Sequence, residues 1–124
     1  MGILYTAECK KCTYSKKLFT GGGRGDCMPS AYMNELSGSC QIKLKNALAE
    51  GAVRASVNRI PCLCKDCGEI FTLPVVKYTL NGEQKELKDC CPACSSENYG
   101  LIEDKAVCPE CKAEIVLVQT GLWD

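Results

Sequence analysis

Residues 89–111 read DCCPACSSENYGLIEDKAVCPEC, a stretch with five cysteines and no histidine. It contains two Cys-x-x-Cys pairs, Cys91/Cys94 and Cys108/Cys111, each with proline after its first cysteine. Two thiolates at this spacing can turn inward from one tight loop and occupy two corners of a tetrahedral metal site, while N–H groups of the loop point at the sulfurs. The stretch therefore predicts metal ligands.

Two further pairs lie nearer the N-terminus: CKKC, which holds Cys9 and Cys12, and CKDC, which holds Cys64 and Cys67. Four pairs supply eight thiolates, enough for two complete four-cysteine sites. The predicted metal ligands are Cys9, Cys12, Cys64, Cys67, Cys91, Cys94, Cys108 and Cys111. We expect two Zn²⁺ per chain, with iron at one or both sites as the alternative, because four thiolates accept either metal.

The cysteine content also bears on the compartment. Twelve of the 124 residues are cysteine, a density typical of either a disulfide scaffold or a metal protein. The first residues have no signal-peptide pattern, and no apolar run approaches the roughly 20 residues of a membrane helix. We therefore expect a soluble cytoplasmic protein that does not enter a membrane, in which thiols stay reduced and metal is the cross-link.

The segments CKDCGEIF, CCPAC and VCPEC resemble the knuckles of zinc ribbons, the rubredoxin-like class in which two Cys-x-x-Cys loops clamp one zinc. The resemblance covers residues 3–20 and 60–120. It implies a small, metal-stabilised, mainly β (α+β) fold of two zinc-ribbon units, built from short antiparallel hairpins with one helical insert. It implies no activity, because zinc ribbons occur in proteins of many different roles.

The sequence between the knuckles favours one way of pairing them. Asn81-Gly82 is a strong signal for a two-residue type I′ hairpin turn. If the chain folds there, Cys64/Cys67 and Cys91/Cys94 reach the same end of one hairpin and share a metal. Cys9/Cys12 then join Cys108/Cys111. Sequential pairing stays open: it joins Cys9/Cys12 to Cys64/Cys67 and the last two knuckles to each other.

The favoured pairing divides the chain into three segments. The first ribbon comprises residues 1–20 and 104–124, with ILYTA and EIVLV pairing as strands; the insert spans 21–59; the second ribbon spans 60–103. In the insert, a glycine-rich hinge precedes a helix that Ser39 caps and Gly51 ends. Its narrow apolar face packs on a ribbon sheet and comprises Cys40, Leu44, Ala47 and Leu48.

Four cysteines lie outside the pairs. We expect Cys40 to be a small buried hydrophobic residue on the helix. Cys62 and Cys90 stand beside predicted ligands and are candidates for alternative ligands or exposed thiols. Cys27, in the glycine-rich loop, is the candidate reactive thiol.

The residue types also restrict the function. Without histidine, the common Cys-His and Ser-His catalytic arrangements are absent, and four protein sulfurs leave zinc no open position, so we expect no enzyme and no small-molecule substrate. We expect an adaptor with two structural zinc sites that binds a protein. The first alternative is a nucleic-acid-binding ribbon of transcription or translation. The net charge of +5 on residues 1–59, against −5 on residues 60–124, favours this alternative, whereas the pI near 6.3 weighs against it. The second is a rubredoxin-like iron electron carrier or a metallochaperone.

Overall fold

The computed structural model describes residues 2–22, 28–102 and 105–123. Within these ranges the chain forms mostly β-strands, together with two α-helices and one turn of 3₁₀-helix. In chain order the elements are β1 (Gly2–Glu8), β2 (Ser15–Gly21), α1 (Pro29–Tyr32), η2 (Met33–Glu35), α2 (Gly38–Ala49), β3 (Val53–Cys64), β4 (Ile70–Leu80), β5 (Glu83–Lys88), β6 (Tyr99–Leu101), β7 (Lys105–Val107) and β8 (Glu114–Trp123).

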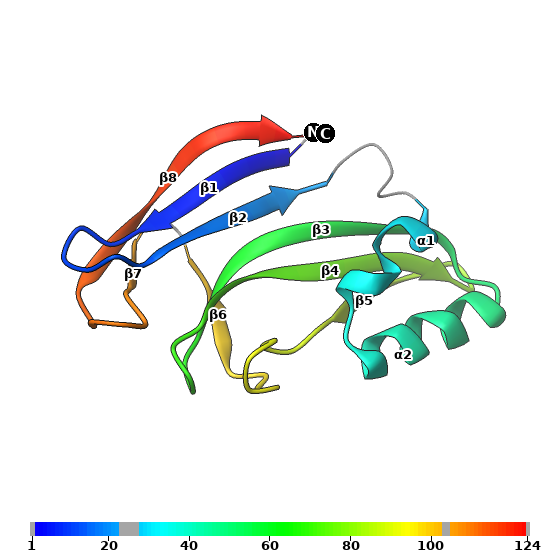
Figure 1. Cartoon of the computed structure of the whole chain (residues 1–124). Helices are drawn as coiled ribbons and strands as arrows, with labels where there is room; N and C mark the ends of the chain where they lie inside the picture. Colours follow the sequence, from blue (N-terminus) through cyan, green and yellow to red (C-terminus); the bar gives the residue numbers. More distant parts are fainter. Residues whose placement is uncertain (1, 23–27, 103–104, 124) are drawn as a thin grey trace.

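The eight described strands form one antiparallel sheet in the order β5-β4-β3-β2-β1-β8-β7, and β6 pairs with β3 beside this path. The sheet curls into a half-barrel that brings the two ends of the chain side by side (Figure 1). β1 pairs with β8 from Glu8 opposite Val116 to Gly2 opposite Trp123. The predicted pairing of ILYTA with EIVLV is therefore confirmed.

The expected fold of two zinc-ribbon units made of short hairpins is wrong. β3 and β4 are 12 and 11 residues long, and a bridge between Gly21 and Arg59 joins β2 to β3, so one sheet runs through both expected units. The physical reason lies in β3, where buried Ala55 and Val57 alternate with exposed residues well before the knuckle. That alternation extends the strand into the segment expected to be an insert.

The hairpin between β4 and β5 forms as the sequence predicts. Asn81 and Gly82 have φ values of 53° and 79°, the two positive values that a type I′ turn requires, and Leu80 lies opposite Glu83. β5 ends at Lys88, however, and the chain then leaves β4. It passes through the third knuckle into β6, which pairs with β3.

Helix α2 covers one face of the sheet near the β4–β5 turn. Its cap is Ser37 rather than the predicted Ser39: the Ser37 Oγ accepts the N–H of Cys40 at 3.4 Å. Its buried face packs with Val57 of β3 and Val76 of β4, so the predicted packing of the helix on the sheet is confirmed; the buried residues of α2 are Cys40, Leu44 and Ala47. Among the described residues, no helix has the length and apolar character needed to span a membrane.

Ile70 ties the two halves of the sheet together. It is fully buried, and although it begins β4 it packs with Leu18 of β2 and Ile115 of β8. Lys16 of β2 reinforces this contact because its ammonium donates to the Ile70 carbonyl and pairs with Glu69 at 3.3 Å. The apolar core is therefore shared across the curl of the sheet.

Shortening Ile70 should test this shared core. We expect Ile70→Ala to lower the free energy of unfolding by about 2 to 5 kcal/mol, because it leaves a cavity between strands from both halves. Ile42→Ala is the matched control: Ile42 is 61% exposed, and its loss should change stability by less than about 0.5 kcal/mol. Urea unfolding of the metal-loaded protein measures both, and equal effects would show that Ile70 is not part of a shared core.

Candidate metal centres

Every predicted knuckle lies in a turn next to a strand end. The Cys9/Cys12 knuckle connects β1 to β2, and the Cys108/Cys111 knuckle connects β7 to β8. The Cys64/Cys67 knuckle connects β3 to β4, and the Cys91/Cys94 knuckle lies between β5 and β6. Strands that start far apart in the sequence thus end in turns of the same kind.

The four turns share a backbone hydrogen bond. In each, the N–H of the first cysteine donates to the carbonyl five residues later; the pairs are Cys9 to Tyr14 (3.0 Å), Cys64 to Glu69 (2.9 Å), Cys91 to Ser96 (2.9 Å) and Cys108 to Ala113 (2.8 Å). In three turns, the backbone N–H of the residue four positions after the first cysteine donates to the carbonyl of that cysteine. This residue has a positive φ in each case: Gly68 (81°), Ser95 (63°) and Lys112 (67°). Only Gly68 signals this conformation in the sequence.

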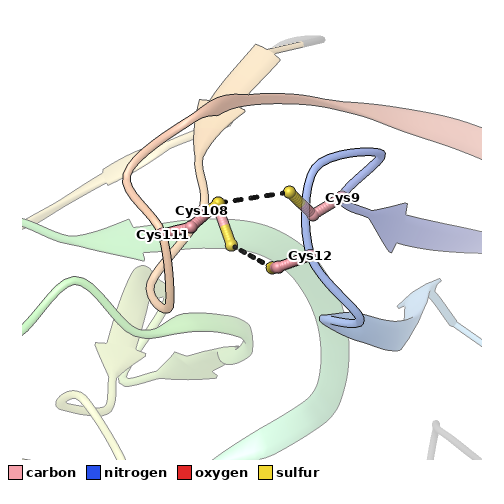
Figure 2. Close-up of side chains that lie close together, drawn as sticks. All are labelled: Cys9, Cys12, Cys108 and Cys111. Carbon is pink, nitrogen blue, oxygen red and sulfur yellow. Dashed lines mark hydrogen bonds between the residues drawn. The ribbon is translucent and has the colours of Figure 1, made fainter.

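The first centre gathers the sulfurs of the first and last knuckles, as Figure 2 shows. The sulfurs of Cys9 and Cys111 are 3.5 Å apart and those of Cys12 and Cys108 are 3.6 Å apart. All four lie within 4.8 Å of one another. A zinc–sulfur bond of about 2.3 Å gives a tetrahedron with edges of about 3.8 Å, so the set has the size that a tetrahedral ion requires.

The second centre has the same dimensions. The sulfurs of Cys64 and Cys94 are 3.6 Å apart, as are those of Cys67 and Cys91, and the four again lie within 4.8 Å. The structure thus groups the knuckles as the hairpin turn favours, and sequential pairing is wrong. The sulfur–sulfur distances in both centres far exceed the length of a disulfide bond, about 2.05 Å, and none of the described cysteines is in a disulfide.

The thiols within each set differ in acidity. Burial raises the pKa of Cys9, but the N–H groups of Lys11 and Cys12, together with hydrogen bonds from the thiols of Cys111 and Cys12, lower that pKa to about 7. The N–H of Cys67 is the main cause that lowers the pKa of Cys64, also to about 7, against the effect of burial. Each centre thus has one thiol that ionises near neutral pH.

A second thiol of each set resists ionisation. The N–H of Tyr14 lowers the pKa of Cys12, but burial and the neighbouring cysteines prevail and raise this pKa to about 12. Cys94 follows the same pattern: the N–H of Ser96 lowers its pKa, whereas burial and the neighbouring thiols raise it to about 12. A cation among the sulfurs supplies the charge that lets such thiols lose their protons.

A hydrogen-bonded clasp joins the two knuckles of the second centre. Asp66, between Cys64 and Cys67, accepts hydrogen bonds from the Ser96 hydroxyl and, at 3.1 Å, from the Asn98 amide. The N–H of Lys65 donates to the Asn98 carbonyl at 2.8 Å. The clasp therefore holds the two pairs of sulfurs together through hydrogen bonds between the knuckles, made by the side chains of Asp66, Ser96 and Asn98 and by the backbone of Lys65 and Asn98. Sequence reasoning missed it.

The first centre has different residues at the corresponding positions. Ala113 and Ile115 follow the Cys108 knuckle where Ser96 and Asn98 follow the Cys91 knuckle, and neither side chain can donate a hydrogen bond. Lys11 takes the position of Asp66 in the first knuckle. The two centres thus match in their sulfurs and differ in what holds their knuckles together.

The three described cysteines outside the pairs, Cys40, Cys62 and Cys90, lie outside both four-sulfur groups. Cys40 and Cys62 are buried, and burial raises the pKa of each thiol to about 11. The prediction for Cys40 is confirmed, whereas Cys62 is neither an exposed thiol nor part of a four-sulfur set. Cys90 is half-buried, and its S–H donates to Asp89 at 3.6 Å. Cys27, the predicted reactive thiol, lies outside the described residues.

Comparison with known proteins adds no family. No protein-family model, curated protein or solved structure matches the chain. What the geometry shows is a cysteine-rich protein in which two groups of four cysteines could hold metal ions.

The Asp66 clasp predicts a difference in metal release. We expect Asp66→Ala to speed the loss of one metal ion per chain about tenfold, because the knuckles of the second centre then separate more easily. Glu110→Ala, at the equivalent exposed position of the Cys108 knuckle, should leave release unchanged. Transfer of metal to a chromophoric chelator measures both rates, and identical release from the two variants would contradict a role for the clasp.

Proposed function

We propose that the chain is a zinc protein with two structural four-cysteine sites that serves as an adaptor for another protein in the reducing cytoplasm. The proposal rests on the number of ligands in each set: two knuckles supply four sulfurs, which is the full number of ligands of a tetrahedral ion. A tetrahedral ion bound by four protein sulfurs has no coordination position left for water or substrate, so we assign these centres no catalytic role.

The burial of the sulfurs supports a structural role for the centres. The first cysteine of each knuckle is buried; these residues are Cys9, Cys64, Cys91 and Cys108. Each belongs to an apolar cluster: Cys9 and Cys108 lie in the cluster of Ile115, and Cys64 and Cys91 lie in the cluster of Phe71. An ion held there would fix the strand ends against the core. Its bond energies would therefore act directly on folding.

A groove on the curled sheet supports a protein partner. It has a volume of about 600 Å³, and its lining residues are Lys17, Phe19, Glu35, Arg59, Thr72, Pro74 and Trp123. The Arg59 guanidinium lies 5.1 Å from the centre of the Trp123 ring and pairs with Glu35 at 2.7 Å, so the groove is walled by side chains held in place. Aromatic residues and arginine in fixed positions are typical anchors of protein interfaces.

The electron-carrier and metallochaperone alternatives draw on a different observation. Cys67, Cys94 and Cys111 are exposed, so one side of each sulfur set faces solvent. Exposed sulfurs admit a competing ligand or an electron-transfer partner. An iron protein would absorb visible light through its thiolates, whereas a zinc protein is colourless, and this distinguishes the two metals.

The groove predicts how partner binding depends on Phe19. Chemical cross-linking in the native host should join the wild-type protein to a discrete partner, and Phe19→Lys should abolish that product because it replaces one of the two aromatic side chains of the groove with a cation beside Lys17 and Arg59. Ile42→Lys is the matched control and should retain the product, because Ile42 is an exposed residue of α2 that does not line the groove. A product that both variants retain would contradict the groove, and steep, salt-dependent binding of the purified protein to RNA or DNA would favour the nucleic-acid alternative.

A further inference from the structure

Asp89 is a buried acidic residue that joins three parts of the chain. It is 9% exposed, and its carboxylate accepts the N–H of Ser37 at 2.7 Å and the N–H of Cys90 at 2.8 Å. Its backbone carbonyl accepts the Tyr99 hydroxyl, also at 2.8 Å. A buried carboxylate that accepts two backbone N–H groups holds both in place, because leaving either group without a partner is costly. Asp89 thus connects the start of α2 to the third knuckle and to β6.

On one side, this junction belongs to the second metal centre. Asp89 precedes Cys91 by two residues, and Cys91 is a fully buried member of the four-sulfur set. The Tyr99 ring lies edge-on to the Phe71 ring, with the ring centres 5.7 Å apart, and packs against the apolar cluster that contains Cys64 and Cys91. The position of Asp89 is therefore set by the knuckle and the cluster that also position the sulfurs.

On the other side, the junction leads to the groove. Ser37 caps α2 and follows Glu35 by two residues, with Leu36 between them buried in the cluster that α2 forms with the sheet. Glu35 binds the Arg59 guanidinium through both carboxylate oxygens, at 2.8 Å and 2.7 Å. Arg59 in turn lies over the Trp123 ring. A displacement of Ser37 would therefore move the residue that holds Arg59 in the groove.

Segment 35–37 has room for such a displacement. The groove shares Glu35, Thr72 and Pro74 with a second cavity, which has a volume of about 290 Å³. The second cavity is also lined by Ser37 and by residues at the third knuckle, which are Asp89, Cys90, Cys91, Pro92 and Ser95. The space between the segment and the knuckle is thus open, and the Asp89 carboxylate bridges it.

We propose that Asp89 is a positioning residue that couples the second metal centre to the groove. With an ion among its sulfurs, the third knuckle holds Asp89, Asp89 holds the segment that contains Ser37 and Glu35, and Glu35 holds Arg59 over Trp123. When the second centre alone is empty, the knuckle loosens and the groove loses this wall.

The coupling deepens the proposed adaptor function and rests on it for the role of the groove. Because such coupling is reciprocal, a partner that binds the ordered groove also strengthens metal binding at the second centre. The link itself can be measured without a partner, since Trp123 is the one tryptophan of the chain and its fluorescence reports on the groove. The coupling and the adaptor function can therefore fail separately.

A double-mutant cycle on protein loaded with Zn²⁺ tests the coupling, with acrylamide quenching of Trp123 as the readout. Cys94→Ser removes an exposed sulfur of the second centre and should raise the quenching constant about twofold, because Arg59 then leaves the ring. In an Asp89→Asn background, the same change should add nothing, since the link is already broken. Cys111→Ser, the matched loss from the first centre, should leave quenching unchanged, because Trp123 ends β8 far from that knuckle.

Asp89→Asn alone tests the link if Cys94→Ser misfolds. It should raise the quenching constant about twofold, and it should speed metal release and exchange of the Ser37 amide about tenfold, because asparagine offers one oxygen to two N–H groups. Asp66→Asn is the matched control at the same centre: its hydrogen bonds go to the clasp rather than to α2, so it should leave quenching and amide exchange unchanged while metal is bound.

Three results would overturn the proposal. Faster exchange at Ser37 with unchanged quenching of Trp123 would show that Asp89 supports only the helix. Equal quenching in Asp89→Asn and Asp66→Asn would show that the link does not pass through Asp89. Additive effects of Cys94→Ser and Asp89→Asn on quenching would show that the second centre and Asp89 act on the groove independently.

Discussion

Four thiolates within 4.8 Å of one another repel unless a cation balances their negative charge, and this constraint acts at two places in the chain. Without a cation, one thiol of each set ionises near neutral pH and a second is held protonated. A divalent ion at the centre of each set would remove this conflict and would turn eight side chains into two cross-links. The rest of the fold is arranged so that the turns which carry these sulfurs meet.

Such cross-links would matter because each sulfur set gathers segments that are distant in the sequence. Cys9 and Cys111 are 102 positions apart in the sequence, and their centre joins the β1–β2 turn to the β7–β8 turn. The second centre joins the β3–β4 turn to the segment before β6. Apolar packing supports both, through the cluster that contains Ile70 and through Phe71, but aromatic residues make up only 6% of the chain. A structural zinc ion contributes on the order of 10 kcal/mol, comparable with the whole stability of a small domain.

The sequence predicts features that short-range chemistry determines. The Cys-x-x-Cys spacing indicates which sulfurs form sets, and Asn81-Gly82 predicts both the β4–β5 turn and the grouping of the knuckles. It does not predict the curl that merges two expected units, because that depends on one bridge between Gly21 and Arg59 and on the burial of Ile70 beside β2 and β8. The Asp66 clasp is equally hidden, since an aspartate followed thirty residues later by a serine has no recognisable pattern.

We infer that metal ions, rather than the apolar core alone, hold this sheet together. This can be tested by removing the metal with a chelator under reducing conditions and following the backbone by circular dichroism while Zn²⁺ is added back. We expect the metal-free chain to lose its sheet and to regain it in proportion to added metal, with saturation at two ions per chain, one for each four-sulfur set. A metal-free chain that keeps its cooperative fold would contradict it.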